Sequence, residues 1–566
     1  MRSRRSDTDP ARTARLGLAI AVACTLAPIA GCDCAPRAPL RDPTTRLPHG
    51  VGTNLDFPVD WSTELPFVDL MRTSRPWISG TEETWEGGPP LALDAHGWPT
   101  RLEAGQVVRT LMAWDITAHP AGRYVVRWRG RGRFELLAGT LGRLDAAGRI
   151  VEAGEGRLVF ELDPRRDGPG ILLNLLESDP EDPIREIAVI VPGGACRSDA
   201  ARYCDDARGC AEGDACVPFE DAFTTRPFHP RFLASMRAYA VIRFMNWADA
   251  NSTHVRMPET TWASRVEPED ARWHGRVPLE IMIALANAAH AEPWLTLPAQ
   301  ADDDYARRAG ALVRERLDPD LRVWVEYSNE VWNEMFPQEQ YARARGLALG
   351  LAEEGSEAAL RFYARRTGEL HRAFAVGLGD DAASPSRMVR VYASQAASPW
   401  RSAQILDFED AYTRSDVLAI APYFGVTVLP GMYDAWRSMS LDGFFARAEA
   451  EDLPVVARML EDQRRIAHAR GLALVAYEGG QHYVAPGDDG ITALFGTAAR
   501  DPRMETLYDR YLALFEAHDG RLMMHMADCT AGGRDGYWGA IEHLGQGPEE
   551  APKLRALLRA AARTRR

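Results

Sequence analysis

The feature that most constrains the fold of this chain is an alternation of apolar, strand-like runs with amphipathic helical segments after residue 230. Seven such runs are predicted as strands, at 239–247, 293–298, 321–330, 387–393, 416–424, 473–479 and 522–527. Repeated βα units form parallel sheets, and an early strand near 67–78 would bring the number to eight. The pattern predicts an α/β fold, a (βα)8 TIM barrel with its active site at the carboxyl ends of the strands.

Residues 81–193 have a different texture, with short β-like runs separated by Gly, Pro and Asp at fairly even intervals. This pattern is typical of an antiparallel β-sandwich. We therefore expect the barrel to start at 51–80, to be interrupted by the sandwich as an inserted domain, and to continue over 218–566. The inserted sandwich could be a plain structural domain or could bind carbohydrate, and both interpretations stay open.

The segment 194–217 is polar and rich in cysteine, so it cannot build a hydrophobic core of its own. Its cysteines are Cys196, Cys204, Cys210 and Cys216. Two local disulfides are predicted, because small polar segments of exported proteins are commonly stapled in this way. A zinc site is the alternative, although the close cysteine pairs of zinc ribbons are missing. The connectivity stays open, and Cys34 and Cys529 remain as a further pair or as free thiols.

The N-terminus carries several arginines followed by the apolar run 16–30, which is typical of a secretory signal peptide over 1–31. The run is short for a membrane span, and Ile29-Ala-Gly-Cys32 resembles the bacterial lipobox, in which the cysteine is acylated. We expect an exported protein, anchored through lipid on Cys32 to the inner or outer membrane of a bacterial envelope. An ordinary signal peptide is the alternative, and the Pro- and Arg-rich segment 32–50 is predicted to be a tether.

The formal net charge of −14 argues against a global attraction for polyanions. Nucleic acid and acidic polysaccharides are therefore not expected partners unless a local basic patch exists, and a neutral saccharide suits the chain better. The thirteen histidines form no HxH or HExxH motif, and no Gly-rich phosphate loop follows a strand. We expect a monomer that needs no cofactor and no metal.

Two glutamates stand at the ends of well-separated predicted strands. Strand alternation places Trp324, Glu326, Ser328 and Glu330 on one face, with Glu330 at the carboxyl rim. Glu478 ends a later strand and is followed by two glycines. Two rim carboxylates are the minimum machinery of glycoside hydrolysis, in which one protonates the leaving oxygen and the other attacks the anomeric carbon or activates water. Glu326, deeper in its strand, is predicted to pair inside the barrel.

The Asn329-Glu330 pair ending the fourth strand and Glu478 ending the seventh resemble the signature of clan A retaining glycoside hydrolases. The resemblance covers about 50–80 and 218–566. It implies that Glu330 is the acid/base, that Glu478 is the nucleophile and that Asn329 donates a hydrogen bond to the sugar 2-hydroxyl. The two carboxyl groups should then lie about 5 Å apart, as a covalent intermediate requires.

Three further residues match positions of this clan: Arg243 in the second strand, Tyr423 ending the sixth and Trp538 after the eighth. The resemblance implies that Arg243 and Tyr423 contact the nucleophile and that Trp538 is a sugar platform. Each also has a purely structural interpretation: Arg243 could form an ion pair, Tyr423 could be a packed aromatic at the rim, and Trp538 could pack within its loop. Trp247 and His482 follow strands at the same end and are expected to line the cleft.

The chain departs from the clan at two places. Several of its families place a histidine two residues before the sixth-strand tyrosine, where this chain has Ala421, and the third strand ends in Leu297-Pro298 without a histidine. No substrate can therefore be carried over from one family. The leading hypothesis is a retaining β-glycosidase on a neutral polysaccharide. The chain is also similar to bacterial exported proteins labelled cellulose-binding, so a surface glycan-binding lipoprotein is the second hypothesis, and a metal-dependent barrel hydrolase the third.

Overall fold

The computed structural model describes residues 47–114, 119–168, 170–205, 208–251, 260–380 and 386–564. The predicted signal peptide, the lipidation site Cys32, Cys34 and most of the tether lie outside these residues. The chain divides into two compact units, Met1–Asp42 and Pro43–Arg566, and the described residues all belong to the second. In the described residues, no helix combines the length and the apolar character that a membrane span needs.

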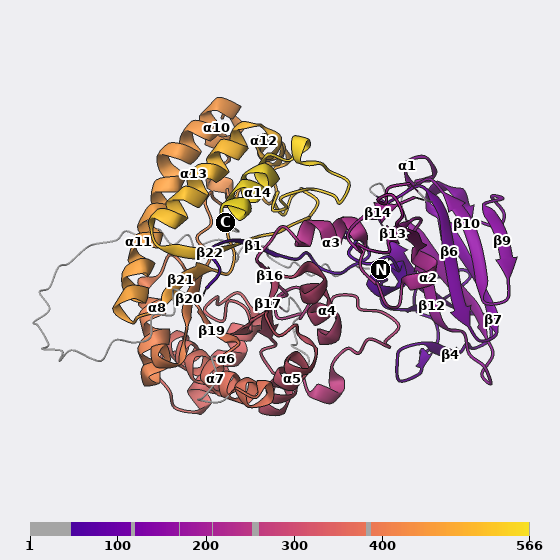
Figure 1. Ribbon diagram of the computed structural model, residues 1–566, viewed down its shortest axis with the longest axis horizontal. Coiled ribbons are helices and arrows are strands. Elements are labelled where there is room, and N and C mark those ends of the chain that lie inside the picture. Colours follow the sequence, from indigo (N-terminus) through magenta and orange to yellow (C-terminus); the bar gives the residue numbers. More distant parts are fainter. Residues whose placement is uncertain are drawn as a thin grey trace, which may run out of the picture. The chain divides into compact units, whose positions relative to one another are not determined.

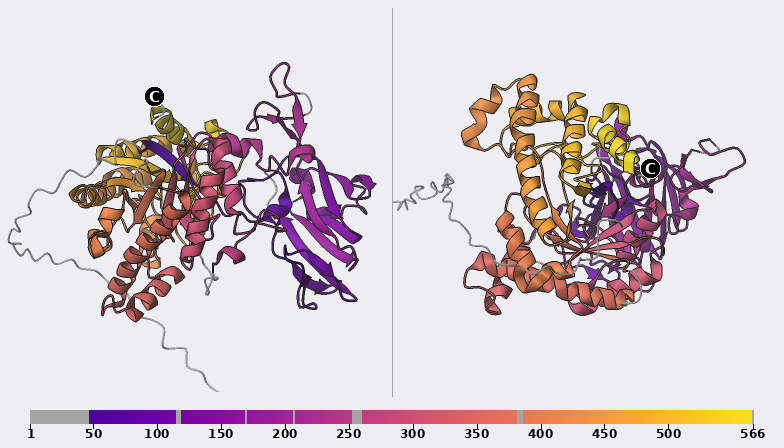
Figure 2. Two further views of the ribbon diagram at one scale, coloured as in Figure 1. Left: turned by 60° about the horizontal axis from the view of Figure 1, so that its bottom comes forward. Right: turned by 60° about the vertical axis from the view of Figure 1, so that its left-hand side comes forward.

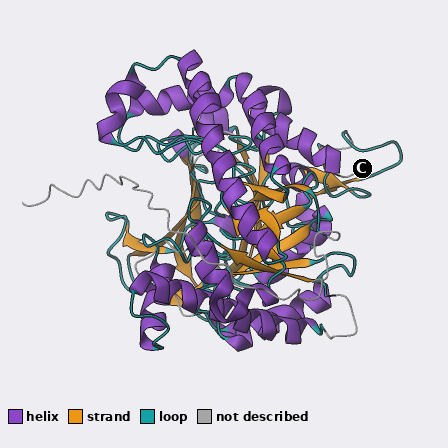
Figure 3. Cartoon of the chain, turned by 90° about the vertical axis from the view of Figure 1, so that its left-hand side faces the viewer, coloured by secondary structure: helices purple, strands orange, loops and turns teal. Residues whose placement is uncertain are grey.

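The second unit contains a closed barrel of parallel strands surrounded by helices, as Figure 1 and Figure 3 show. In barrel order the strands are β1 (Gly50–Asn54), β16 (Val241–Arg243), β17 (Glu292–Leu297), β18 (Val323–Tyr327), β19 (Met388–Ala393), β20 (Val417–Ile420), β21 (Ala473–Ala476) and β22 (Gly520–His525). Pairing of β1 with both β16 and β22 closes the ring. Trp294, Trp324 and Tyr477 fill its interior with smaller aliphatic side chains. The predicted (βα)8 barrel is confirmed.

The first barrel strand differs from the prediction. It is β1, whereas the segment 67–78 forms a 3₁₀ helix at Leu70–Thr73 and leads into β2 (Ile78–Thr81), which pairs outside the barrel. A barrel strand must be buried on both faces and lie close to its neighbours, and β1 achieves this with small residues. A Cβ added at Gly52 would lie 2.4 Å from the Met524 sulfur. The apolar segment at 67–78 was therefore the wrong choice of first strand.

The helices follow the barrel strands along the chain and pack around them. The longer ones are α3 (Pro230–Met236), α4 (Leu279–Ala289), α5 (Asp303–Arg316), α6 (Pro337–Ala348), α7 (Gly355–Leu378), α8 (Pro399–Asp407), α10 (Leu441–Arg447), α11 (Leu453–Ala469), α12 (Asp489–Arg500), α13 (Arg503–Ala517) and α14 (Pro552–Thr564). Their starts are set by local chemistry; Asp302, for example, caps α5 by accepting the Tyr305 backbone N–H at 2.7 Å.

Between β1 and β16 the chain forms two large antiparallel sheets, which Figure 2 shows from two further directions, in addition to smaller sheets of two and three strands. One sheet contains β12 (Arg185–Ile190), β6 (Gly122–Arg129), β10 (Arg157–Leu162) and β9 (Ile150–Gly154). The other contains β2, β5 (Gln106–Ala113), β11 (Ile171–Ser178), β7 (Gly132–Ala138) and β8 (Gly142–Arg143). Trp128 of one sheet meets Phe134 of the other edge-on at 5.0 Å. The expected antiparallel β-domain is present as an insertion in the barrel.

The cysteine-rich segment follows the sandwich and forms a small sheet of β14 (Tyr203–Cys204), β13 (Gly194–Cys196) and β15 (Cys216–Pro218). Cys196 is bonded to Cys210 and Cys204 to Cys216. The two predicted local disulfides are confirmed, and the interleaved connectivity is new information. Cys529 is a buried free thiol.

Candidate active site

Glu330 and Glu478 stand just beyond the carboxyl ends of β18 and β21. Between β18 and Glu330 the backbone takes an unusual course, because Ser328 and Glu330 both have left-handed φ angles, of 58° and 44°. Residues other than glycine seldom adopt this conformation, which costs about 1–3 kcal/mol and is concentrated at functional sites. The packing around the barrel mouth thus holds Glu330 in a conformation that its own backbone disfavours.

Arg243, at the end of β16, is the centre of the site and is completely buried. It donates to Glu326 through Nε and Nη2 at 2.9 and 3.1 Å. Nη1 donates to Asn54 Oδ1 at 3.0 Å and to Glu478 Oε1 at 2.9 Å. Nη2 also donates to Asn329 Oδ1 at 2.8 Å. These bonds use all five N–H donors of the guanidinium, so its orientation is fixed.

Glu326 pairs inside the barrel, as predicted, because Arg243 and the Trp294 indole N–H both donate to it. Burial raises the pKa of Glu326, and the charge of Arg243 opposes that rise. The two carboxylates that Arg243 contacts raise its own pKa despite burial, which acts to lower it. One cation therefore faces two glutamates, and only Glu478 of the two lies at the rim.

Glu478 is held by a second donor in addition to Arg243. The Tyr423 hydroxyl donates to Oε2 at 3.0 Å, so each carboxylate oxygen accepts a hydrogen bond from a different strand end. The residue is 7% exposed. Two directed bonds restrict the carboxylate to one orientation, which is what a nucleophile needs. The structure thus brings Arg243 and Tyr423 to Glu478, where the sequence placed them.

Glu330 has a contrasting environment. Its oxygens accept from the Tyr477 hydroxyl at 2.9 Å and from Asn333 Nδ2 at 3.0 Å, and neither donor carries a charge. Burial raises the pKa of Glu330 from 4.5 to about 7, the nearby negative charge of Glu478 adds to the rise, and the two hydrogen bonds oppose it. A carboxyl with this pKa holds its proton at pH 6 and can serve as a general acid.

An aromatic wall lies beside Glu478 and is made by His482, Trp538 and Tyr423. Ring centroids are 4.9 Å apart for His482 and Trp538, and 5.6 Å for each of these with Tyr423. His482 is fixed by Thr427 at 2.9 Å, and burial lowers its pKa, which favours the neutral ring. Aromatic faces of this kind stack on the apolar faces of sugar rings.

Trp247 is not part of this cluster, contrary to the expectation that it lines the cleft. It is 0% exposed and packs against Phe67, Phe232 and Phe244 at ring distances of 5.4, 6.2 and 5.7 Å. These partners belong to the hydrophobic core outside the barrel. A substrate has no access to a side chain buried in this way, so Trp247 is a packing residue.

Three residues of the site were missed from the sequence: Asn54, Asn333 and Tyr477. Asn54 ends the barrel strand that was misplaced, so its position at the rim was hidden. Tyr477 directly precedes Glu478, and Asn333 follows Glu330 by three residues, which is a spacing that local contacts commonly use. Tyr477 and Asn333 could have been predicted, because each is a hydrogen-bond donor close in sequence to one of the two glutamates.

The chain matches no known family profile and no curated protein. Solved structures with a similar arrangement include a GH51 arabinofuranosidase from Xanthomonas axonopodis pv. citri, with 12% identity, 54% of this chain and 61% of that chain covered, and a TM-score of 0.32. A Bacteroidetes-affiliated GH5 cellulase has 12% identity, with 58% of this chain and 86% of that chain covered and a TM-score of 0.32. The β-glycosidase of Thermosphaera aggregans has 11% identity, with 61% of this chain and 85% of that chain covered and a TM-score of 0.34. Likenesses this remote say nothing about activity.

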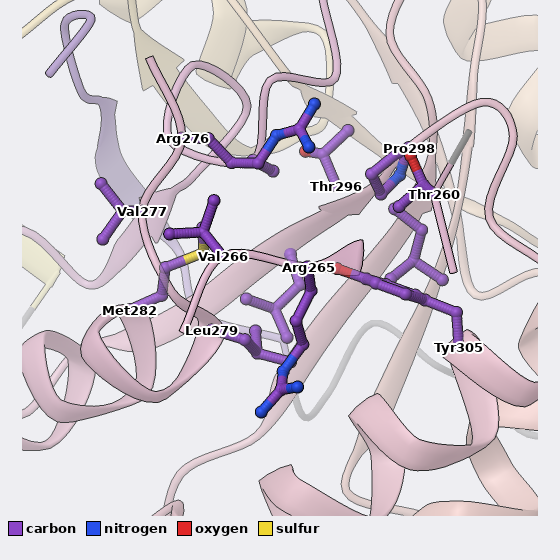
Figure 4. Close-up of a pocket in the computed structure, with 13 residues that line it drawn as sticks. Thr260, Arg265, Val266, Arg276, Val277, Leu279, Met282, Thr296, Pro298 and Tyr305 are labelled. Carbon is purple, nitrogen blue, oxygen red and sulfur yellow. The ribbon is translucent and has the colours of Figure 1, made fainter. Parts of the chain in front are cut away.

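A separate cavity at the end of β17, shown in Figure 4, contains none of the predicted site residues. Its volume is about 40 Å³, and its walls include Val277, Met282, Thr296 and Tyr305. A few water molecules would fill such a space, and a sugar ring would not fit. The candidate active site is therefore the rim cluster around Glu330 and Glu478.

Proposed function

We propose that this protein is a retaining glycoside hydrolase that cleaves β-glycosidic bonds of a neutral polysaccharide or oligosaccharide by double displacement. The observation that carries the proposal is the contrast between the two rim glutamates. Glu478 accepts from a cationic guanidinium and a hydroxyl, whereas burial raises the pKa of Glu330 to about 7. A carboxylate held by a cation and a carboxyl whose pKa burial raises divide naturally into a nucleophile and an acid.

In the first step, Glu478 attacks the anomeric carbon, the bond to the leaving oxygen breaks, and Glu330 gives its proton to that oxygen. The product is a glycosyl ester on Glu478. In the second step, Glu330 removes a proton from water, the water oxygen bonds to the anomeric carbon, and Glu478 leaves as a carboxylate. Both residues return to their starting states, and the carboxyl separation of about 5 Å that this route requires remains a prediction.

The other predicted residues take supporting roles in this proposal. Arg243 and Tyr423 hold the nucleophile through the bonds described above. The Asn329 oxygen is occupied by Arg243, which directs the amide N–H₂ elsewhere and suits it for donating to the sugar 2-hydroxyl. Trp538 and His482 would form one wall of the sugar site.

A surface glycan-binding lipoprotein with a weakened barrel is the alternative. It is disfavoured because both rim glutamates are present and each is held by two side-chain hydrogen bonds, and a binder has no need of a carboxyl whose pKa is near 7. For either function we also propose export and anchoring to the bacterial envelope through Cys32. Metabolic labelling with a palmitate analogue tests the anchor, because the Cys32→Ser variant should lose the label.

The decisive experiment measures reducing-sugar release by the full chain from β-glucan, mannan, xylan and galactan, with Glu478→Ala beside the wild type. Release that disappears in the variant, and whose first product is the β anomer by NMR, is the expected result. No release from any polymer, combined with equal retention of both proteins on an insoluble glycan, would overturn the hydrolase in favour of the binder.

A further inference from the structure

A cleft lies where the sandwich meets the barrel rim. Its volume is about 460 Å³, within the range of small-ligand sites of about 300–1,000 Å³. Polar and charged side chains line it: His119, Asp163, Arg165, Arg231 and His543. The sandwich supplies the first three and the barrel the last two, so neither domain could form the cleft alone.

The barrel side of this cleft belongs to the catalytic face. His543 lies in the segment that follows β22 and also carries Trp538. The next residue, Leu544, donates its backbone N–H to Thr63 in the segment after β1. Arg231 stands in the first turn of α3, the helix that precedes β16. Because segments after the strands of a barrel gather at the carboxyl rim, a polysaccharide bound at Glu478 could extend toward this cleft.

The charges in the cleft favour an anion. Arg165 and Arg231 contribute two guanidinium groups against one carboxylate, that of Asp163, which already accepts the Arg165 backbone N–H at 3.2 Å. Within the described part of the chain neither guanidinium forms an ion pair. Arg231 instead lies 5.0 Å from the Tyr203 ring centroid, which supports one of its faces. A guanidinium supported on one face presents its N–H fork to carboxylate or sulfate oxygens.

His543 adds a further donor. Its Nδ1 accepts the backbone N–H of Gly545 at 3.2 Å, so Nε2 carries the ring proton that can be donated to a ligand. The lining therefore combines two cations with an imidazole N–H. This set matches a sugar that has both an oxyanion and hydroxyl groups, and it is richer in donors than a neutral sugar requires.

We propose that this cleft binds an acidic sugar residue, through the oxyanion of a uronic acid or of a sulfate ester, as a distal subsite of the polysaccharide substrate. The inference rests on the proposed function in taking the ligand to be a saccharide, and it deepens it by adding an acidic substituent to an otherwise neutral chain. The net charge of −14 repels a continuous polyanion, so isolated acidic residues are recognised.

The test measures binding of glucuronate, glucose 6-sulfate and glucose to the full chain by saturation-transfer NMR. Proteins compared are the wild type, the Arg165→Glu/Arg231→Glu double variant, and Arg458→Glu as a charge-reversed control on the exposed face of α11. We expect at least one acidic sugar to bind about tenfold more tightly than glucose, and the double variant alone to lose this preference. Preference for glucuronate would identify a carboxylate as the bound group, and preference for glucose 6-sulfate would identify a sulfate ester.

Equal affinity for acidic sugars and glucose would overturn the inference, as would an acidic preference that survives the double charge reversal. Inorganic sulfate binding as tightly as the preferred sugar would also overturn it, because the cleft would then recognise an ion and no sugar. The proposed hydrolase activity is tested separately, by Glu478-dependent release of reducing sugar from neutral polymers. Binding is measured without turnover, so the two failures cannot be confused.

Discussion

The barrel and the sandwich use charged side chains in opposite ways. Inside the barrel, Arg243 is 0% exposed and all five of its donors are bonded to protein acceptors. On the sandwich, charged residues pair across strands in water, as Arg133 and Glu177 do at 2.9 Å with their side chains 61% and 64% exposed. Both regions contain arginine–glutamate pairs of similar length, yet their surroundings give these pairs different consequences.

The difference follows from solvation. A buried ion loses several kcal/mol of hydration and is tolerated only where an opposite charge and hydrogen bonds compensate for that loss. An exposed pair loses little hydration and contributes about 0–1 kcal/mol. The barrel network thus fixes the orientation of Glu478, and the sandwich pairs mainly keep the surface polar.

Replacing Arg243 should produce the largest effect. Arg243→Met keeps much of the side-chain volume but leaves Glu326 and Glu478 buried without a cation, so we expect unfolding free energy to fall by about 3–5 kcal/mol. Urea unfolding measures this. In variants that remain folded, activity should also be lost because Glu478 is released. A loss below about 1 kcal/mol would show that the buried network behaves like a surface pair.

Ionisation of Glu330 should make the free energy of unfolding depend on pH. Its folded pKa of about 7 lies above its ordinary 4.5, so the folded state holds the proton more tightly. The stabilisation is fully present below pH 4.5 and is lost as pH rises through 7. Relative to Glu330→Gln, which does not titrate, wild-type unfolding free energy should decline by about 3 kcal/mol across this range.

The same group should appear in the kinetics. Wild-type kcat/KM should fall above a pH of about 7 as the acid loses its proton, and this fall should be absent from the residual activity of Glu330→Gln. Parallel stability and activity profiles for the wild type and the variant would contradict the assignment of Glu330 as the acid.

Lys553, buried in α14, should have an intermediate effect. Its Nζ donates to the Tyr537 carbonyl at 2.6 Å, Gln481 Nε2 donates to the same oxygen at 2.5 Å, and burial lowers the pKa of Lys553 to about 7. Trp538 directly follows Tyr537, so Lys553→Met should loosen the aromatic wall to which Trp538 belongs. We expect a loss of about 1–2 kcal/mol in stability and a several-fold higher KM with little change in kcat. An unchanged KM would limit Lys553 to a structural role.

Arg133→Met on the sandwich should have the smallest effect and serves as the control for Arg243→Met. The pair with Glu177 is exposed on both sides, so unfolding free energy should change by less than about 0.5 kcal/mol and activity should be unaffected. Urea unfolding and steady-state kinetics under identical conditions complete the comparison. A loss comparable to that of Arg243→Met would remove the distinction between the two regions.

Local pattern was sufficient for much of the fold. The alternation of strand and helix periods predicted the barrel, because each element must bury one face or both. Depth within a strand predicted that Glu326 pairs inward and that Glu330 reaches the rim. The same reasoning failed for β1, since its small residues Gly50 and Gly52 carry little hydrophobic signal, and for Trp247, since position after a strand does not say which way a side chain turns.

The sequence by itself thus determined the fold class, the two rim glutamates and the presence of local disulfides. Only the tertiary structure decided which cysteines pair, that Asn54 and Tyr477 belong to the site, and that the two glutamates have opposite surroundings. The reason is distance along the chain: Arg243 and Glu478 are 235 residues apart, and Asn54 and Tyr477 are 423 apart. Periodicity reports the burial of each element, but barrel closure decides which side chains meet.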